Sequence, residues 1–253
     1  MSLDFSPAAG AARPWARIRA HALTEARMVA RNHEQQILAL VIPLGLLVGA
    51  RWFGGRLGTD IASMAPGVLA LAIWSTAFTS VAISTGFERR YGVLERLAAT
   101  PLGRTGLLAG KAVATILVAA VQLTILAAVA VALGWRPHPG PAGSLALMVG
   151  VVLALIAFTS LALIMAGTLA PEVVLGLANL VFLLGLAGGG LLVPLASHPD
   201  VLRPVVGALP TAALGELLRG WDAGGAPWWT LAVLAAWAVV LVLIARKVFR
   251  WTS

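Results

Sequence analysis

Gly110 and Lys111 have the residue types that end a nucleotide-binding loop. Such a loop needs the pattern G-x-x-x-x-G-K-[ST], in which glycine amides cradle phosphates and a hydroxyl meets Mg²⁺. Here the earlier glycine position is Thr105 and the hydroxyl position is Ala112. The pair also opens an apolar run instead of following a strand. The sequence therefore predicts that this chain has no ATPase site of its own.

The four histidines also lack a catalytic or metal-binding pattern. None is paired with another at i, i+4, and none joins carboxylates in a zinc-like spacing. The segment Ser197-His198-Pro199-Asp200 contains hydrolase residue types, but Ser, Pro and Asp are also turn formers, and a turn is the simpler interpretation. The absence of cysteine excludes disulfides and Cys-ligated metals. We expect no catalytic residue, no metal and no cofactor on this chain.

A dense group of charged residues lies in the segment 87–110. We predict a short helix at about 88–99 that stops before Pro101, because the residue preceding a proline resists helical geometry. Its apolar edge would contain Val93, Leu94 and Leu97. Its charged face would contain Glu88, Arg89, Arg90, Glu95 and Arg96. A charged helix held beneath a membrane could dock a cytoplasmic partner. The alternative is a solvated loop whose arginines only set the orientation of the chain.

The composition indicates what holds this segment in place. The 253 residues are 60% hydrophobic and 11% charged, with a mean hydropathy of +0.93. Soluble domains have about 45–50% apolar and about 25% charged residues. A soluble enzyme domain is therefore excluded, and residues 1–253 are predicted to form one all-α polytopic membrane domain. The net charge is +8, but the basic residues flank apolar runs, so we expect contact with membrane lipids and not with nucleic acid.

Six apolar runs are predicted to be transmembrane helices, since a span needs roughly 20 mostly apolar residues. They are residues 37–53, 61–85, 111–134, 144–169, 173–194 and 228–245. Before them, residues 14–36 have an apolar stripe and an arginine-rich face, which predicts an amphipathic helix on the membrane surface. Residues 195–227 contain two short apolar pieces around Pro210, too short to cross. We predict an extracellular re-entrant helical hairpin there, with a surface loop as the alternative.

The basic residues are shared unevenly between the two sides of these spans. Six spans put both termini and the 87–110 loop on one side, which carries 13 of the 18 Lys and Arg residues. The positive-inside rule makes that side cytoplasmic. Arginine greatly outnumbers lysine in a chain rich in Ala, Gly and Leu, which suggests a GC-rich bacterial genome. We expect a multi-pass protein of the bacterial inner membrane with both termini in the cytoplasm.

Polar side chains inside the predicted spans could bond other helices or line a pathway. The candidates are Ser75, Thr79, Gln122 and Asn179. The amides of Gln122 and Asn179 should face protein or a cavity, because lipid cannot satisfy them. No charged residue lies clearly within a span, which argues against a proton relay.

The string E-R-R-Y-G-V-L-E-R-L-A-A-T-P-L-G-R, with a Gly-Lys that opens a membrane helix, resembles the coupling segment of ABC transporter permeases of the type-2 exporter family. The resemblance covers nearly the whole chain, including GGGLLVPLASHPDVLRPVVGALPTAALGELLRG, which is similar to the family's extracellular re-entrant helices. It implies that two permease chains, identical or different, form the pathway. It also implies that cytoplasmic ATPase subunits bind ATP and Mg²⁺ and drive the transport cycle.

The resemblance assigns coupling to the ATPase to one set of residues. They are Glu88, Arg89, Arg90, Gly92, Leu94, Glu95, Arg96, Thr100, Pro101 and Arg104. Compact size and short loops resemble the drug-exporter branch, so we expect a permease subunit for a hydrophobic or amphipathic, drug-like compound. Export of a lipid or lipid-linked glycan is the alternative. A membrane-embedded enzyme or a docking scaffold is more remote.

Overall fold

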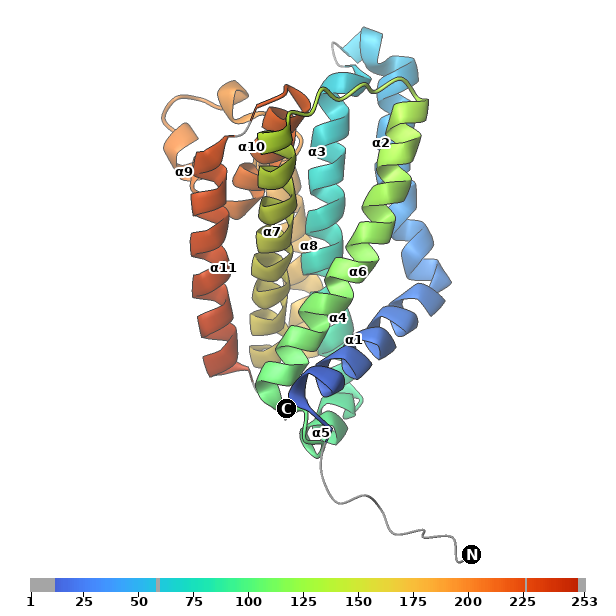
Figure 1. The fold of residues 1–253 in the computed structure, drawn as a ribbon, viewed down its shortest axis with the longest axis vertical. Coiled ribbons are helices and arrows are strands. Elements are labelled where there is room, and N and C mark those ends of the chain that lie inside the picture. Colours follow the sequence, from blue (N-terminus) through green and yellow to red (C-terminus); the bar gives the residue numbers. More distant parts are fainter. Residues whose placement is uncertain (1–11, 58–59, 226, 250–253) are drawn as a thin grey trace, which may run out of the picture.

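A computed structural model describes residues 12–57, 60–225 and 227–249. These residues form helices joined by turns, and none of them is in a strand (Figure 1). Within this described part of the chain, five helical segments are long and apolar enough to cross a membrane: Ile61–Arg90, Gly103–Ala132, Pro141–Thr168, Pro171–Gly188 and Trp228–Val248. The sixth apolar helix, Ala39–Gly54, is shorter and lies within α2 (His33–Leu57). The chain is thus an all-helical, multi-pass membrane protein.

The amphipathic segment is α1 (Pro14–Arg31), which runs obliquely across the lower part of the bundle in Figure 1. Pro14 suits its first turn, because the missing N–H of proline has no intrahelical partner there. The expected end at residue 36 is wrong. Asn32 leaves helical geometry at φ −82° and ψ 77°, and the chain turns there into α2. α2 therefore begins before the expected residue 37.

The second predicted span is a continuous stack of α3 (Ile61–Trp74), the π-helix η1 (Ser75–Ser80) and α4 (Val81–Arg90). Asp60 caps its start: the carboxylate accepts from the Ser63 N–H at 2.8 Å, and the Asp60 N–H donates to Ser63 Oγ at 3.2 Å. The span continues to Arg90 instead of ending at residue 85. Its last turn therefore carries part of the expected coupling segment.

The single helix expected at 88–99 is wrong. Gly92 adopts φ +68°, a left-handed conformation that breaks the helix, and only α5 (Val93–Ala98) follows. α5 is anchored by Leu94, which is fully buried against Leu107, Leu163 and Phe249. α6 (Gly103–Ala132) starts eight residues before the expected 111, so Lys111 lies inside a helix.

The remaining spans are α7 (Pro141–Thr168), α8 (Pro171–Gly188) and α11 (Trp228–Val248). α8 ends well before the expected residue 194, because the backbone turns at Gly190 with φ +75°. The chain then forms the 3₁₀ turn η2 (Leu195–Ser197), α9 (Arg203–Gly207) and α10 (Pro210–Asp222). α10 packs against α3, α7 and α11, with Leu214 and Leu217 fully buried. The region is therefore a packed helical segment and not a surface loop.

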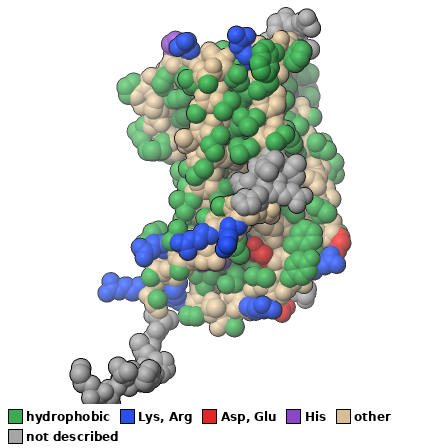
Figure 2. Space-filling model, turned by 90° about the vertical axis from the view of Figure 1, so that its right-hand side faces the viewer, with side chains coloured by type: hydrophobic (Ala, Val, Ile, Leu, Met, Phe, Trp, Pro, Cys, Tyr) green, Lys and Arg blue, Asp and Glu red, His purple; other side chains and the backbone are tan. Residues whose placement is uncertain are grey.

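The two ends of the bundle are formed by different elements. The end of α11, the start of α1 and α5 share one end, while α9, α10 and the α6–α7 connection share the other (Figure 1). At that second end the Trp135 indole donates to Asp222 Oδ1 at 3.0 Å. Figure 2 shows Lys and Arg side chains gathered low on one face, beneath a largely hydrophobic surface with a few basic groups at the top. Arg250, one of the counted basic residues, lies outside the described residues.

Candidate functional site

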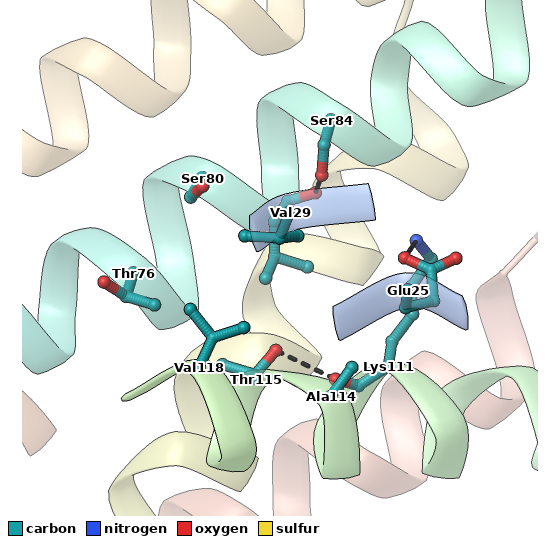
Figure 3. A pocket seen from close by; sticks show the side chains of 10 residues that line it. Glu25, Val29, Thr76, Ser80, Ser84, Lys111, Ala114, Thr115 and Val118 are labelled. Atoms are coloured by element: carbon teal, nitrogen blue, oxygen red, sulfur yellow. Dashed lines mark hydrogen bonds and ion pairs between the residues drawn. The ribbon is translucent and has the colours of Figure 1, made fainter. Parts of the chain in front are cut away.

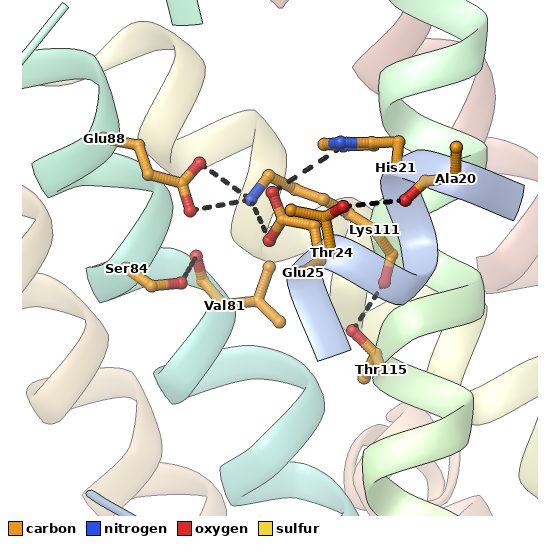
Figure 4. Close-up of polar contacts among 9 residues, drawn as sticks. All are labelled: Ala20, His21, Thr24, Glu25, Val81, Ser84, Glu88, Lys111 and Thr115. Atoms are coloured by element: carbon orange, nitrogen blue, oxygen red, sulfur yellow. Dashed lines mark hydrogen bonds and ion pairs between the residues drawn. The ribbon is translucent and has the colours of Figure 1, made fainter. Parts of the chain in front are cut away.

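Lys111 is buried where α1, α4 and α6 meet, with 3% of its surface exposed (Figure 4). Its Nζ donates to Glu25 Oε2 of α1 at 3.0 Å and to Glu88 Oε1 of α4 at 2.9 Å. These three residues are called the Lys111 cluster below. Because a buried charge is tolerated only when paired, each member needs the others. One lysine from α6 thus fastens two other helices to it.

His21 and Gly110 pack beside the cluster. A Cβ built on Gly110 would overlap Cδ2 of the His21 ring, so the glycine lets α1 lie close against α6. His21 Nε2 lies 3.7 Å from Glu25 Oε1. Burial lowers the pKa of His21 below its usual 6.5, although the carboxylate of Glu25 opposes this. The Gly-Lys pair that resembles a nucleotide loop therefore serves helix packing and charge pairing.

The charged residues that were expected to share one face of a helix at 88–99 contact different partners. Glu88 is half-buried in the Lys111 cluster, with 16% of its side chain exposed, and does not face outward as expected. Arg89 Nη1 donates to the carbonyls of Ala166 and Leu169, 3.2 Å away in each case, at the end of α7. Arg90 pairs with Glu172 of α8 at 2.5 Å on the surface. These three residues tie α4 to its neighbours because α4 continues as a helix up to Arg90.

The other predicted coupling residues surround α5. Exposed side chains come from Glu95, Arg96, Thr100, Pro101 and Arg104, whereas Leu94 is buried and Gly92 forms the turn. The Arg17 guanidinium of α1 donates to the Pro101 carbonyl just after α5. Leu94 and α1 therefore both hold α5 against the lower end of the bundle. The exposed pair Glu95 and Arg96 is left facing outward.

A small cavity of about 30 Å³, lined by apolar side chains and several hydroxyls, extends from Lys111 along α4 and η1 (Figure 3). A water needs roughly 10–15 Å³, so the cavity has room for one or two. Its hydroxyls come from Thr76, Ser80, Ser84 and Thr115. The candidates Ser75 and Thr79 are half-buried and do not line it. The hydroxyl residues at 76, 80 and 84 recur every four positions. This spacing is the sequence signal that would have indicated that they share the helix face lining the cavity.

Gln122 joins three helical segments above this cavity. Thr76 Oγ1 donates to Gln122 Oε1 at 2.5 Å, and Gln122 Nε2 donates to the Ala39 carbonyl at 3.1 Å. The expectation that Gln122 faces protein is confirmed. For Asn179 the same expectation is wrong within this chain. Asn179 is exposed on α8, and its Nδ2 donates to the Leu175 carbonyl of its own helix at 2.9 Å.

These features define a helical membrane subunit in which the short surface helix α5 is packed against the membrane-spanning helices. The model of the ABC-2 type transporter family matches residues 19–221, and the chain belongs to that family. Members are transmembrane subunits without an ATPase domain, and ABC permeases pair with separate ATPase subunits.

Two curated relatives come from strains of Mycobacterium tuberculosis. Both are named probable doxorubicin resistance ABC transporter permease protein DrrC. Each is 28% identical to this chain over 232 residues, covering 86% of this chain and 84% of the relative. The family match over residues 19–221 spans the positions of the Lys111 cluster and α5.

Proposed function

We propose that this chain is the permease subunit of an ATP-driven exporter of hydrophobic or amphipathic, drug-like compounds. The observation that carries the proposal is the similarity to DrrC along 86% of the chain, in a family of transport subunits. Separate ATPase subunits would hold ATP and Mg²⁺ and supply the energy. The compound would leave from the cytoplasm or from the inner leaflet.

The proposed location is the bacterial inner membrane, with six spans, both termini and α5 in the cytoplasm. α2 would be the first span: its apolar part, Ala39–Gly54, is short, but the whole 25-residue helix extends about 37 Å, compared with about 30 Å of hydrocarbon. The orientation is supported by Arg96, Arg104, Arg246 and Lys247, which lie near the α5 end.

In the proposed coupling mechanism, an ATPase subunit docks on the exposed charges of α5. Leu94 packs on Leu107 of α6 and Leu163 of α7, so movement of α5 would displace these helices. The Lys111 cluster would carry the same movement to α1 and α4. Closely packed helices and paired buried charges resist continuous deformation, so they suit a switch between two arrangements.

A second permease chain is proposed to pack on α8. Only 11% of the α8 span is buried in the single chain, the lowest share among the five spans. Asn179 is an exposed amide near the middle of this helix, where lipid offers no hydrogen-bond partner. A facing protein chain would supply that partner.

The test is transport by inside-out vesicles that contain the chain and its ATPase. We expect ATP-dependent accumulation of doxorubicin or another cationic amphiphile, and none with an ATPase that cannot hydrolyse ATP. The opposite result is hydrolysis stimulated by a lipid-linked glycan and by no drug-like compound. That result would replace drug export with glycan export.

A further inference from the structure

A groove of about 340 Å³ lies between α6 and α11, with α7 as its floor, toward the end of the bundle where α11 finishes (Figure 1). Its walls are largely apolar and include Leu108, Val113, Ile116 and Val242. This volume is within the range of small-molecule sites, roughly 300–1,000 Å³. In a membrane-spanning bundle, such a groove suits an acyl chain.

Two polar groups in this groove lack protein partners. Arg246 is exposed at its end and has no carboxylate within 4.0 Å among the described residues. Thr159 is 1% exposed, and its Oγ1 has no hydrogen-bond partner in the described part of the chain. The neighbouring Ser160 hydroxyl is already satisfied, donating to the Ile156 carbonyl at 2.7 Å. Buried polar groups in proteins are normally hydrogen bonded, so the Thr159 hydroxyl points to a ligand.

The two residues also lie at neighbouring depths in the bundle. A Cβ built on Gly167 of α7 would lie 3.2 Å from Phe249 Cα, so Phe249, three residues after Arg246, is level with a residue about two turns beyond Thr159. Since α7 and α11 run side by side in the same direction, Thr159 lies roughly 7.5 Å deeper in the bundle than Arg246, at 1.5 Å of rise per residue. A phosphate and an ester carbonyl of one phospholipid are separated by a similar span.

We propose that this groove binds one anionic diacyl phospholipid. Its phosphate pairs with Arg246, an ester carbonyl accepts from Thr159, and an acyl chain covers the apolar walls. A zwitterionic choline head is disfavoured, because its ammonium would lie near the cationic Arg246. Binding requires only the permease chain, so it is independent of the exported compound and of the ATPase.

The test is native mass spectrometry of the purified chain after incubation with equimolar phosphatidylglycerol and phosphatidylcholine. We expect retention of one phosphatidylglycerol. Arg246→Gln should lower its occupancy roughly fivefold, as expected for loss of one cation near an anionic lipid. Lys247→Gln is the matched control, because it removes the neighbouring charge outside the groove and should have little effect. Equal losses in both variants, or equal retention of the two lipids, would overturn the site.

Two further variants test the interior of the groove. Thr159→Val keeps the shape of the side chain and removes the hydroxyl, so it should weaken binding of the diester lipid and leave its diether analogue unchanged. Ala112→Leu adds bulk to the wall and should reduce retention of both lipids while the charges remain. Wild-type retention of the diester lipid by both variants would place the lipid elsewhere.

Discussion

Lys111 Nζ lies 2.8 Å from Glu88 Oε2, although the two residues are 23 positions apart and α5 lies between them. This pair closes the base of the loop that carries α5, joining α4 to α6. Glu25 adds α1 to the same ammonium at 3.0 Å. A force on α5 would therefore act on α1, α4 and α6, because their charged side chains are paired in the Lys111 cluster.

Lys111→Met should strongly destabilise the protein. It removes the ammonium and leaves two carboxylates buried, a change that costs about 3–5 kcal/mol in other proteins. Denaturant titration in detergent measures the free energy of unfolding. Arg90→Met is the control: it breaks the Arg90–Glu172 pair, whose side chains are 51% and 66% exposed, and should cost about 0–1 kcal/mol. Similar losses in both variants would mean that the cluster is not a clamp.

Gly110→Ala should displace α1, because the new Cβ overlaps the His21 ring. Overpacking of this kind costs about 1–3 kcal/mol. Adding His21→Ala makes room for the methyl group, so the double variant should recover part of the stability lost by Gly110→Ala. Gly176→Ala is the control, since nothing lies within 4 Å of a Cβ built there. Strictly additive losses for Gly110→Ala and His21→Ala would contradict the contact.

The attachment of α1 should weaken in acid because of His21. Burial lowers its pKa below 6.5, so the unfolded chain binds the proton more readily. This contribution is full above about pH 6.5 and is lost as the pH falls through the lowered pKa. Thermal unfolding between pH 7.5 and 5.5 measures it. His21→Gln should flatten this part of the profile, leaving any contribution of Glu25 and other carboxylates. An unchanged slope in His21→Gln would assign the dependence to other groups.

Gln122→Leu should destabilise the chain by about 1–3 kcal/mol, because it leaves the buried Thr76 hydroxyl and the Ala39 carbonyl without their partner. Asn179→Leu should leave the unfolding free energy of the single chain nearly unchanged, since Asn179 bonds only its own helix. Chemical denaturation of both variants in detergent gives the comparison. A larger loss for Asn179→Leu would show that the exposed amide supports the fold.

Hydropathy made the positions of the spans predictable, and proline made the start of α1 predictable, since Pro14 begins that helix. The end of α8 was placed too late, because the apolar run continues past the glycines at 188–190, where the helix stops. The break at Gly92 was missed, because the charge pattern on both sides is compatible with one helix. Helix ends were also misplaced where charged residues continue a helix beyond the apolar core, as at Arg90 and Arg104.

The Lys111 cluster could not be predicted from local spacing. Glu25 and Lys111 are 86 positions apart, and their contact depends on how α1 folds back on α6. The sequence did contain a weak signal. Glu25 is the only acidic residue of α1 among several arginines, and Lys111 is one of two lysines in the chain. Acidic and basic residues isolated in this way beside a membrane span are candidates for pairing.

In the proposed mechanism α5 transmits the conformational change of the ATPase to the membrane spans, and Glu95→Arg tests this role most directly. Glu95 is exposed, so its reversal should barely affect folding, by about 0–1 kcal/mol. At a docked surface the same change places like charges together and costs several kcal/mol. Asp200→Arg, also exposed but at the opposite end of the bundle, is the matched control.

The measurement is drug-stimulated ATP hydrolysis by the permease and its ATPase reconstituted together in liposomes. We expect Glu95→Arg to lower the stimulated rate at least about tenfold, the effect of roughly 1.4 kcal/mol. Asp200→Arg should retain the wild-type rate. Wild-type stimulation by Glu95→Arg, in a chain that inserts and folds normally, would contradict the assignment of α5 as the coupling helix.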